Sequence, residues 1–109
     1  MIKMSVTYPN KPGGHFDADY YLTVHMPLAA RLLGHALNAV TAEIGVGGGA
    51  PGVPATYAAI AGFTCDSVDA FMQAFLPVAD QLRGDIPNYT NIEPVIQFSS
   101  LTDFPISPA

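Results

Sequence analysis

The chain has 109 residues, 50% of them hydrophobic and only 12% charged, which is the composition of one globular domain and excludes a disordered chain. The net charge is −5, and the basic residues Lys3, Lys11, Arg31 and Arg83 form no run, which argues against binding to nucleic acid or to an anionic membrane. The single cysteine, Cys65, excludes an internal disulfide and fits the reducing cytoplasm, where we expect the protein. No signal peptide and no apolar stretch of membrane-spanning length is visible. The low charge also indicates that some apolar surface is buried against a partner.

The N-terminal segment predicts a strand followed by a loop. Apolar and polar side chains alternate over Met1–Tyr8, which is typical of a half-buried strand with a period of two residues. The segment Pro9–Gly14 is a loop by its proline and glycine content.

The segment Phe16–Gly34 predicts an interrupted helix. Asp17 suits the N-cap, because its carboxylate can accept from the first amides of a helix, and from Tyr21 onward apolar residues recur at helical spacing. Pro27 lacks an amide hydrogen and crowds the preceding turn, so we expect a kink, or a break after which Pro27 begins a second helical piece. Gly34 is expected to end this piece as a C-cap glycine.

The middle of the chain predicts two strands and a long connection. Asn38–Val46 alternates weakly, and Thr56–Thr64 is apolar at both parities, as in a central strand that is covered on two sides. The glycine- and proline-rich segment Gly47–Ala55 joins them. It lacks the lysine of a phosphate-binding loop and leads into a strand, so it is interpreted as a flexible hairpin connection.

The C-terminal part predicts a second helix and a last strand. Asp66 is the expected N-cap, and Pro77 is expected to begin a short extra turn that ends at Gly84. Glu93–Leu101 is the last predicted strand, and residues 103–109 form an irregular tail with two prolines.

The resulting order is β-α-β-β-α-β, which predicts an α+β, ferredoxin-like fold. Right-handed crossovers place both helices on one face of a four-stranded antiparallel sheet. The other sheet face would be bare, although Thr56–Thr64 is too apolar to face water. We therefore expect a two-fold homodimer whose sheets pack face to face into a barrel-like core.

His25 is the candidate catalytic residue. It lies on the apolar face of the interrupted helix, in the last turn before the break, where a histidine in an apolar pocket can act as an acid or base. A core histidine with one backbone hydrogen bond is the structural alternative. His15 and His35 show no metal-ligand spacing with His25, and no metal site is expected. Cys65 is interpreted as a small buried hydrophobic residue.

Tyrosines are the candidate ligand-contacting residues. The chain has five of them, and each offers an apolar ring and one hydroxyl, which suits an aromatic or hydrophobic ligand. We expect Tyr8, Tyr21 and Tyr89 to shape the substrate pocket together with Leu28. Arg31, one turn beyond Leu28, could bind a carboxylate, but a solvated or salt-bridged arginine is the more common case.

Four stretches resemble the EthD family of small bacterial proteins: YPNKPGGHFDADYYLTVHMPLAARLLG, GGGAPGVPATYAAIAGF, DSVDAF and GDIPNYTNIEPVIQFS. The resemblance covers nearly the whole chain, and YYLTVHMPL with IPNYTNIEPVIQ is its most specific part. It implies a single ferredoxin-like, dimeric α+β barrel domain over residues 1–109, with a pocket between the helices and the sheet of each protomer. The superfamily includes cofactor-independent monooxygenases, muconolactone isomerases and polyketide cyclases. His25 matches the histidine of the family's H-x-P position.

Two functions from different classes follow. The first is a cofactor-free enzyme, oxidoreductase- or monooxygenase-like or isomerase-like, that acts on a small hydrophobic or aromatic molecule with His25 as general acid or base. Its setting would be xenobiotic degradation, because the family is named for an association with ethyl tert-butyl ether degradation and is commonly labelled an oxidoreductase. The alternative is a non-catalytic accessory protein that binds a small molecule in the same pocket. A module that acts through its dimer face is a third, lower hypothesis.

Overall fold

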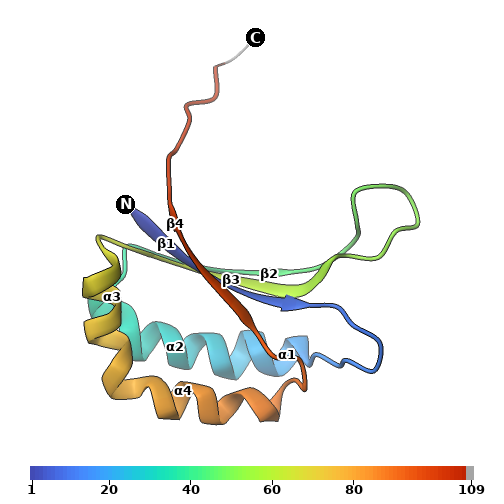
Figure 1. The fold of residues 1–109 in the computed structure, drawn as a ribbon, viewed down its shortest axis with the longest axis horizontal. Coiled ribbons are helices and arrows are strands. Elements are labelled where there is room, and N and C mark those ends of the chain that lie inside the picture. The colour runs from blue at the N-terminus through green and yellow to red at the C-terminus, as the bar shows by residue number, and fades with distance from the viewer. Residues whose placement is uncertain (108–109) are drawn as a thin grey trace.

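The computed structural model describes residues 1–107 and shows one antiparallel sheet with helices along one of its faces (Figure 1). The strands are β1 (Ile2–Pro9), β2 (Ala39–Ile44), β3 (Tyr57–Cys65) and β4 (Val95–Ser100), in the sheet order β2-β3-β1-β4. All neighbouring strands are antiparallel. The predicted four-stranded α+β fold with helices on one face is therefore confirmed, and the sheet of the single chain is open.

The first helical segment contains a wide turn that the sequence did not predict. It runs through α1 (Ala18–Tyr20), a π-helical turn (Tyr21–His25), α2 (Met26–Leu33) and a short 3₁₀ turn. Asp17 caps α1 as predicted, since its Oδ1 accepts from the Tyr20 amide at 3.1 Å. Pro27 lies in the first turn of α2, directly after this wide turn, and its missing amide interrupts the hydrogen-bond ladder that still reaches Met26, whose amide donates to the Tyr21 carbonyl. The expected break therefore takes the form of a π-helical turn.

Gly34 ends α2 but not in the expected conformation. Its φ of −54° is right-handed helical, and the chain continues as a 3₁₀ turn over Gly34–Ala36. Since no left-handed residue is needed at this position, the end of α2 does not depend on the conformational freedom of glycine.

The second helical segment runs through α3 (Val68–Phe75), a 3₁₀ turn (Leu76–Val78), α4 (Ala79–Asp85) and a further 3₁₀ turn (Ile86–Asn88). The predicted N-cap Asp66 is wrong: Ser67 caps α3, with its Oγ accepting from the Ala70 amide at 3.0 Å. The Asp66 carboxylate accepts instead from the side-chain amide of Asn38, also at 3.0 Å. Pro77 begins the second piece as expected, and α4 extends to Asp85.

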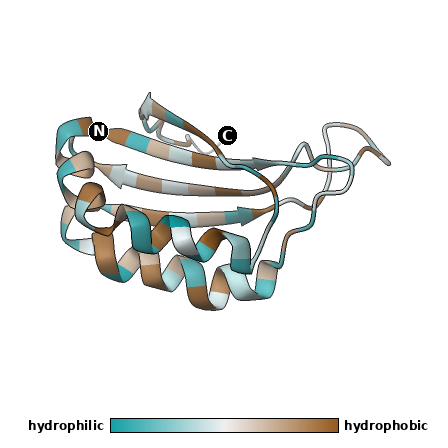
Figure 2. Cartoon of the chain, turned by 60° about the horizontal axis from the view of Figure 1, so that its bottom comes forward, coloured by the Kyte–Doolittle hydropathy of each residue, from teal (hydrophilic) through white to brown (hydrophobic). Residues whose placement is uncertain are grey.

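The core lies between the sheet and the two helical segments, which run along the same side of the sheet (Figure 2). Met4 and Tyr8 of β1 and Ala61 and Phe63 of β3 point toward the helices and are buried. The strands alternate, so the other face of β3 presents Ala58, Ile60, Gly62 and Thr64. Only Ile60 in this set is a large apolar residue. Both faces of β3 therefore have an apolar composition in the sequence, although one of them is not covered by helices.

Two segments project from the packed body (Figure 1). The connection between β2 and β3 forms a long hairpin, as predicted, with Gly52 in the left-handed region at φ +78°. After β4, the Leu101 amide donates to the Met1 carbonyl at 3.0 Å, and the chain then leaves the sheet with Phe104 and Ile106 exposed. Residues 108 and 109 of the predicted irregular tail lie outside the described residues. No helix within residues 1–107 is long and apolar enough to cross a lipid bilayer.

Candidate functional site

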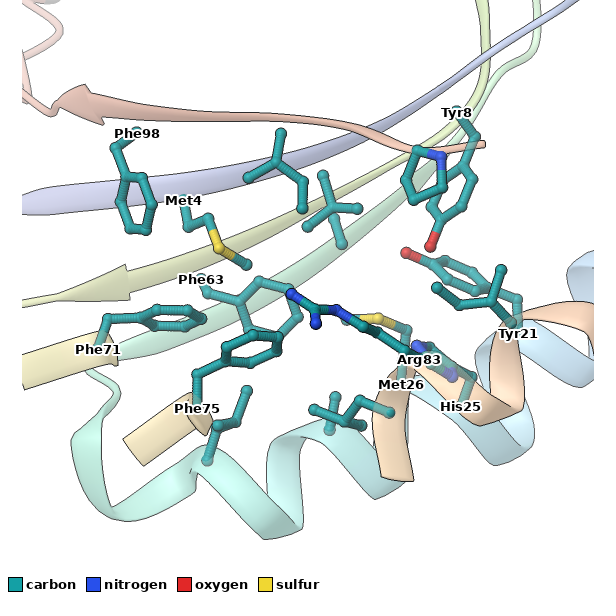
Figure 3. A pocket seen from close by; sticks show the side chains of 18 of the residues that line it. Met4, Tyr8, Tyr21, His25, Met26, Phe63, Phe71, Phe75, Arg83 and Phe98 are labelled. Carbon is teal, nitrogen blue, oxygen red and sulfur yellow. The ribbon is translucent and has the colours of Figure 1, made fainter. Parts of the chain in front are cut away.

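A cavity of about 280 Å³ lies between the sheet and the helical segments (Figure 3). Its volume is close to the lower end of the range for small-molecule sites, about 300–1,000 Å³. One end is lined by Tyr8, Tyr21 and His25. The other end is lined by phenylalanines from the sheet and from α3, namely Phe63, Phe71, Phe75 and Phe98. The cavity thus has a polar end and an aromatic end.

The π-helical turn supplies both Tyr21 and His25 to the polar end of the cavity. The His25 side chain is only 10% exposed, and its ring stacks on the Tyr21 ring with centroids 5.7 Å apart. The ring of Tyr89 lies 4.7 Å from it on another side. Aromatic rings therefore fix the orientation of the imidazole.

Asp85, the last residue of α4, holds the imidazole through Nδ1. The distance from His25 Nδ1 to Asp85 Oδ2 is 2.9 Å. With Asp85 ionised, Nδ1 carries a proton and donates, which leaves Nε2 as the nitrogen for exchange with a ligand. Nε2 has no hydrogen-bond partner within residues 1–107.

The Asp85 carboxylate is itself held by two neighbours. Its Oδ1 accepts from the Tyr20 hydroxyl at 2.6 Å and from the Asn88 side-chain amide at 2.9 Å. Burial opposes ionisation of Asp85, but the hydrogen bonds from Tyr20, Asn88 and His25 outweigh it and lower the pKa of this carboxyl below its usual value. Asp85 is therefore ionised at neutral pH and can accept the hydrogen bond from Nδ1 of His25.

The tyrosines at the polar end are neutral hydrogen-bonding groups. The Tyr8 and Tyr89 hydroxyls bond to each other at 2.7 Å, and either can be the donor. Burial raises the pKa of Tyr21 and Tyr89 far above the usual tyrosine value, and it raises the pKa of Tyr8 as well. Each phenol therefore keeps its proton at physiological pH.

The Tyr21 hydroxyl is buried and has no hydrogen-bond partner in the part of the chain that the structure describes. Leaving a buried polar atom unpaired costs about 1–3 kcal/mol. Since Tyr21 lines the cavity, a ligand oxygen could accept this hydrogen bond. The unpaired hydroxyl thus marks the polar end as a place that is suited to a ligand.

The structure brings three of the five predicted site residues together on the cavity wall: Tyr8, Tyr21 and His25. Tyr89 lies behind them, fully buried, where it bonds to Tyr8 and packs against His25 without lining the cavity. Leu28 packs against the core from α2 and does not line the cavity either.

The sequence interpretation missed Asp85 and Arg83. Asp85 is 60 residues from His25, so no local spacing relates the two, although both fall within stretches that carry the family resemblance. Arg83 lies on the cavity wall with its Cζ 5.4 Å from the centroid of the Phe75 ring. Arg31, the arginine considered from the sequence, is exposed on α2 and does not line the cavity.

Within residues 1–107, neither a cluster of metal ligands nor an activated thiol contributes to the site. Among residues 1–107, no three His, Cys, Asp or Glu side chains gather in a way that could hold a metal ion. Cys65 is fully buried at the end of β3, and its thiol lies 3.4 Å from the Ser67 carbonyl oxygen. Burial raises the pKa of Cys65, with the nearby Asp66 adding to the effect, so the thiol is not activated as a nucleophile.

The topology and the cavity together define a small ferredoxin-like α+β protein with a pocket between sheet and helices. Within that class the chain belongs to the EthD family: the family model described as the EthD domain matches residues 16–93. This segment includes the π-helical turn, both helical segments and Asp85.

Solved structures agree with this assignment. An EthD-like protein from Ralstonia eutropha JMP134 is 42% identical, with a TM-score of 0.85, 90% of this chain covered and 88% of that chain. An ethyl tert-butyl ether (EthD) family protein from Bacillus halodurans C-125 has a TM-score of 0.65 at 13% identity, with 94% and 99% covered. HapK from Hahella chejuensis has a TM-score of 0.54 at 12% identity, with 97% and 99% covered. The last two show the fold alone. No curated protein matches the chain.

Proposed function

We propose that this protein is a cofactor-independent enzyme that moves a proton on a small hydrophobic or aromatic carbonyl compound. The observation that carries the proposal is the pairing of His25, on the wall of the cavity, with an ionised Asp85. A base that is oriented by a third group is the arrangement that general acid–base catalysis needs.

The proposed step is proton abstraction from a carbon next to a carbonyl group. Nε2 of His25 takes the proton, and the C–H electron pair moves to the carbonyl oxygen. Asp85 stabilises the imidazolium that forms, and the Tyr21 hydroxyl donates to the developing oxyanion. The same enolate would serve an oxidoreductase- or monooxygenase-like reaction as well as an isomerisation, so the proposal is made at the level of this shared step.

Hydrogen–deuterium exchange tests the step without knowledge of the product. Wild-type protein in D₂O is expected to accelerate deuterium uptake at the carbon beside the carbonyl in enolisable aryl ketones such as 1-tetralone, measured by proton NMR. His25→Ala should lower the catalysed rate by about 100-fold or more, which is the typical contribution of a general base. A His25→Ala protein that folds normally and exchanges at the wild-type rate would rule out this mechanism.

An accessory protein that binds its ligand without turnover is the second candidate. The unpaired Tyr21 hydroxyl and the aromatic end of the cavity favour it, because both serve binding as well as catalysis. A ligand that binds stoichiometrically and is recovered unchanged would support this function. For either candidate, we propose a role in xenobiotic ether degradation, because the EthD family to which the chain belongs is named after ethyl tert-butyl ether.

We also propose that the protein is a cytoplasmic homodimer that associates through the bare face of the sheet. This face presents the small side chain of Ser5 together with Ile60 of β3, while the Lys3 side chain lies over Gly62. The exposed side chain of Val95 extends its apolar area. A second copy of the same face would cover it by symmetric packing. The single, buried Cys65 suits the reducing cytoplasm.

A further inference from the structure

The permanent charge on the wall of the cavity is positive and comes from Arg83. Among residues 1–107, Arg83 is the only permanently charged residue on this wall, and no acidic residue lines it. Within residues 1–107, the guanidinium of Arg83 forms no ion pair and no hydrogen bond; the one ion pair there joins His25 and Asp85. The wall therefore carries a positive charge that has no acidic partner among residues 1–107.

The position of Arg83 lets it face both solvent and ligand. It is an exposed residue that also lines the cavity, so it stands at the rim. Figure 3 shows its side chain extending from α4 toward Phe75, between the polar and the aromatic ends of the cavity. The contact with the Phe75 ring restricts the guanidinium, which reduces the entropy lost when a partner binds.

A guanidinium matches a carboxylate in shape as well as in charge. Its planar N–H groups can donate two parallel hydrogen bonds to the two carboxylate oxygens. The net charge of −5 would disfavour an anion near most of this molecule, so a local cation is what an anionic ligand needs in order to bind.

We propose that the natural ligand of this cavity is a small hydrophobic carboxylate. Its ring system lies among the phenylalanines, and its carboxylate pairs with Arg83 at the rim. The cavity has the volume of about nine water molecules at ~30 Å³ each, which corresponds to a molecule of one or two rings. This inference deepens the proposed function and rests on it, because it takes the same cavity as the substrate site.

A matched pair of probes tests the charge. Binding of 2-naphthoate and of the isosteric, uncharged 2-naphthamide is measured by titration calorimetry at pH 7.5, where the acid is ionised. Wild-type protein is expected to bind the acid about tenfold or more tightly than the amide, as for a hydrogen bond to a charged group. Arg83→Gln should lower the affinity for the acid to that for the amide, and leave the affinity for the amide within about twofold.

Two further variants serve as controls. Arg83→Lys keeps the charge but not the planar fork, so part of the preference for the acid should remain. Arg31→Gln removes a cation outside the cavity wall and should leave both affinities unchanged. Equal binding of acid and amide to wild type, a preference that survives in Arg83→Gln, or no binding of either probe up to millimolar concentration would each overturn the inference.

The proposed catalytic function fails by a different measurement. If 2-naphthoate binds in an Arg83-dependent way while neither 1-tetralone nor an enolisable aryl keto acid exchanges its protons, the ligand class stands and the proposed proton transfer is refuted. If exchange depends on His25 while the preference for the acid is absent, catalysis stands and the carboxylate ligand is refuted.

Discussion

The ring and the hydroxyl of Tyr21 differ in how well the fold accommodates them. Its ring packs among Tyr8, Phe16, His25 and Tyr89, while its hydroxyl has no hydrogen-bond partner within residues 1–107. The ring therefore contributes to stability, whereas the hydroxyl costs free energy in the protein without ligand. Tyr8 is the opposite case, because its hydroxyl is bonded to Tyr89.

The pair of variants Tyr21→Phe and Tyr8→Phe separates these roles. Tyr21→Phe removes an unpaired hydroxyl, so the free energy of unfolding should stay equal or rise by up to about 1 kcal/mol, while ligand affinity falls. Tyr8→Phe leaves the buried Tyr89 hydroxyl unpaired and should lower the free energy of unfolding by about 1–3 kcal/mol. Urea unfolding measures both. Equal destabilisation by the two substitutions would show that Tyr21 has a partner within the fold.

At the scale of elements, Asp85 joins the two helical segments. It ends α4, yet its partners Tyr20 and His25 belong to the first segment, at α1 and in the π-helical turn. With Asn88 from the 3₁₀ turn after α4, three groups bond to this one carboxylate from two parts of the chain. Asp85 therefore fixes how α4 lies against the π-helical turn.

This contact makes stability depend on pH. The folded pKa of Asp85 is below its unfolded value, so the carboxylate contributes stability above about pH 4, and this contribution is lost as the pH falls through the folded pKa. Asp85→Asn should lower the free energy of unfolding by about 1 kcal/mol at pH 7 and by clearly less near pH 3. Urea unfolding at the two pH values checks this. Asp103→Asn, in the tail, is the matched control, and a loss from Asp85→Asn that is equal at both pH values would contradict the prediction.

Local chemistry in the sequence was sufficient for most elements and for part of the site. Asp17 could be identified as a cap because a cap bonds to amides within the next three residues. Pro27 marked the interruption because a proline disturbs the helical turn directly before it, which is also a local effect. Asp66 was misassigned because an equally good cap, Ser67, follows it. The Asp66 carboxylate instead accepts a hydrogen bond from Asn38, which lies 28 residues away in the sequence.

The missing part of the site depends on tertiary structure. Tyr8, Tyr21 and His25 could be found as polar groups on apolar faces, but alternation and spacing do not reveal which such groups share a cavity. Asp85 reaches His25, and Arg83 reaches the rim, only when α4 packs beside the first helical segment. Tertiary packing also decides that Tyr89, although predicted to contact the ligand, lies behind the cavity wall.

At the scale of the whole molecule, the two faces of the sheet differ. One is covered by helices and contains the cavity, and the other is bare in the single chain (Figure 2). Ile60 lies near the middle of the bare face, beside Thr7 of β1 and Glu43 of β2. If a charged residue replaced Ile60, the two-fold axis of the proposed dimer would bring the two introduced charges close together.

Ile60→Asp is therefore expected to shift the proposed dimer to monomer, because like charges would be buried against each other. Light scattering coupled to size-exclusion chromatography measures the mass, and circular dichroism verifies the fold. Leu76→Asp makes the same exchange on the helical side, where the residue is 65% exposed, and should leave the assembly unchanged. A wild-type protein that is monomeric at all concentrations would refute the dimer.

The fold also contains a built-in reporter of its own opening. Cys65 is the only thiol of the chain, and its side chain is sealed between the end of β3 and the start of β1, with 0% exposure. A thiol reagent can reach it only when the structure around this end of β3 opens, so the labelling rate at high reagent concentration counts such opening events. The native cysteine thus allows the rate of opening at this end of the sheet to be measured without any engineered label.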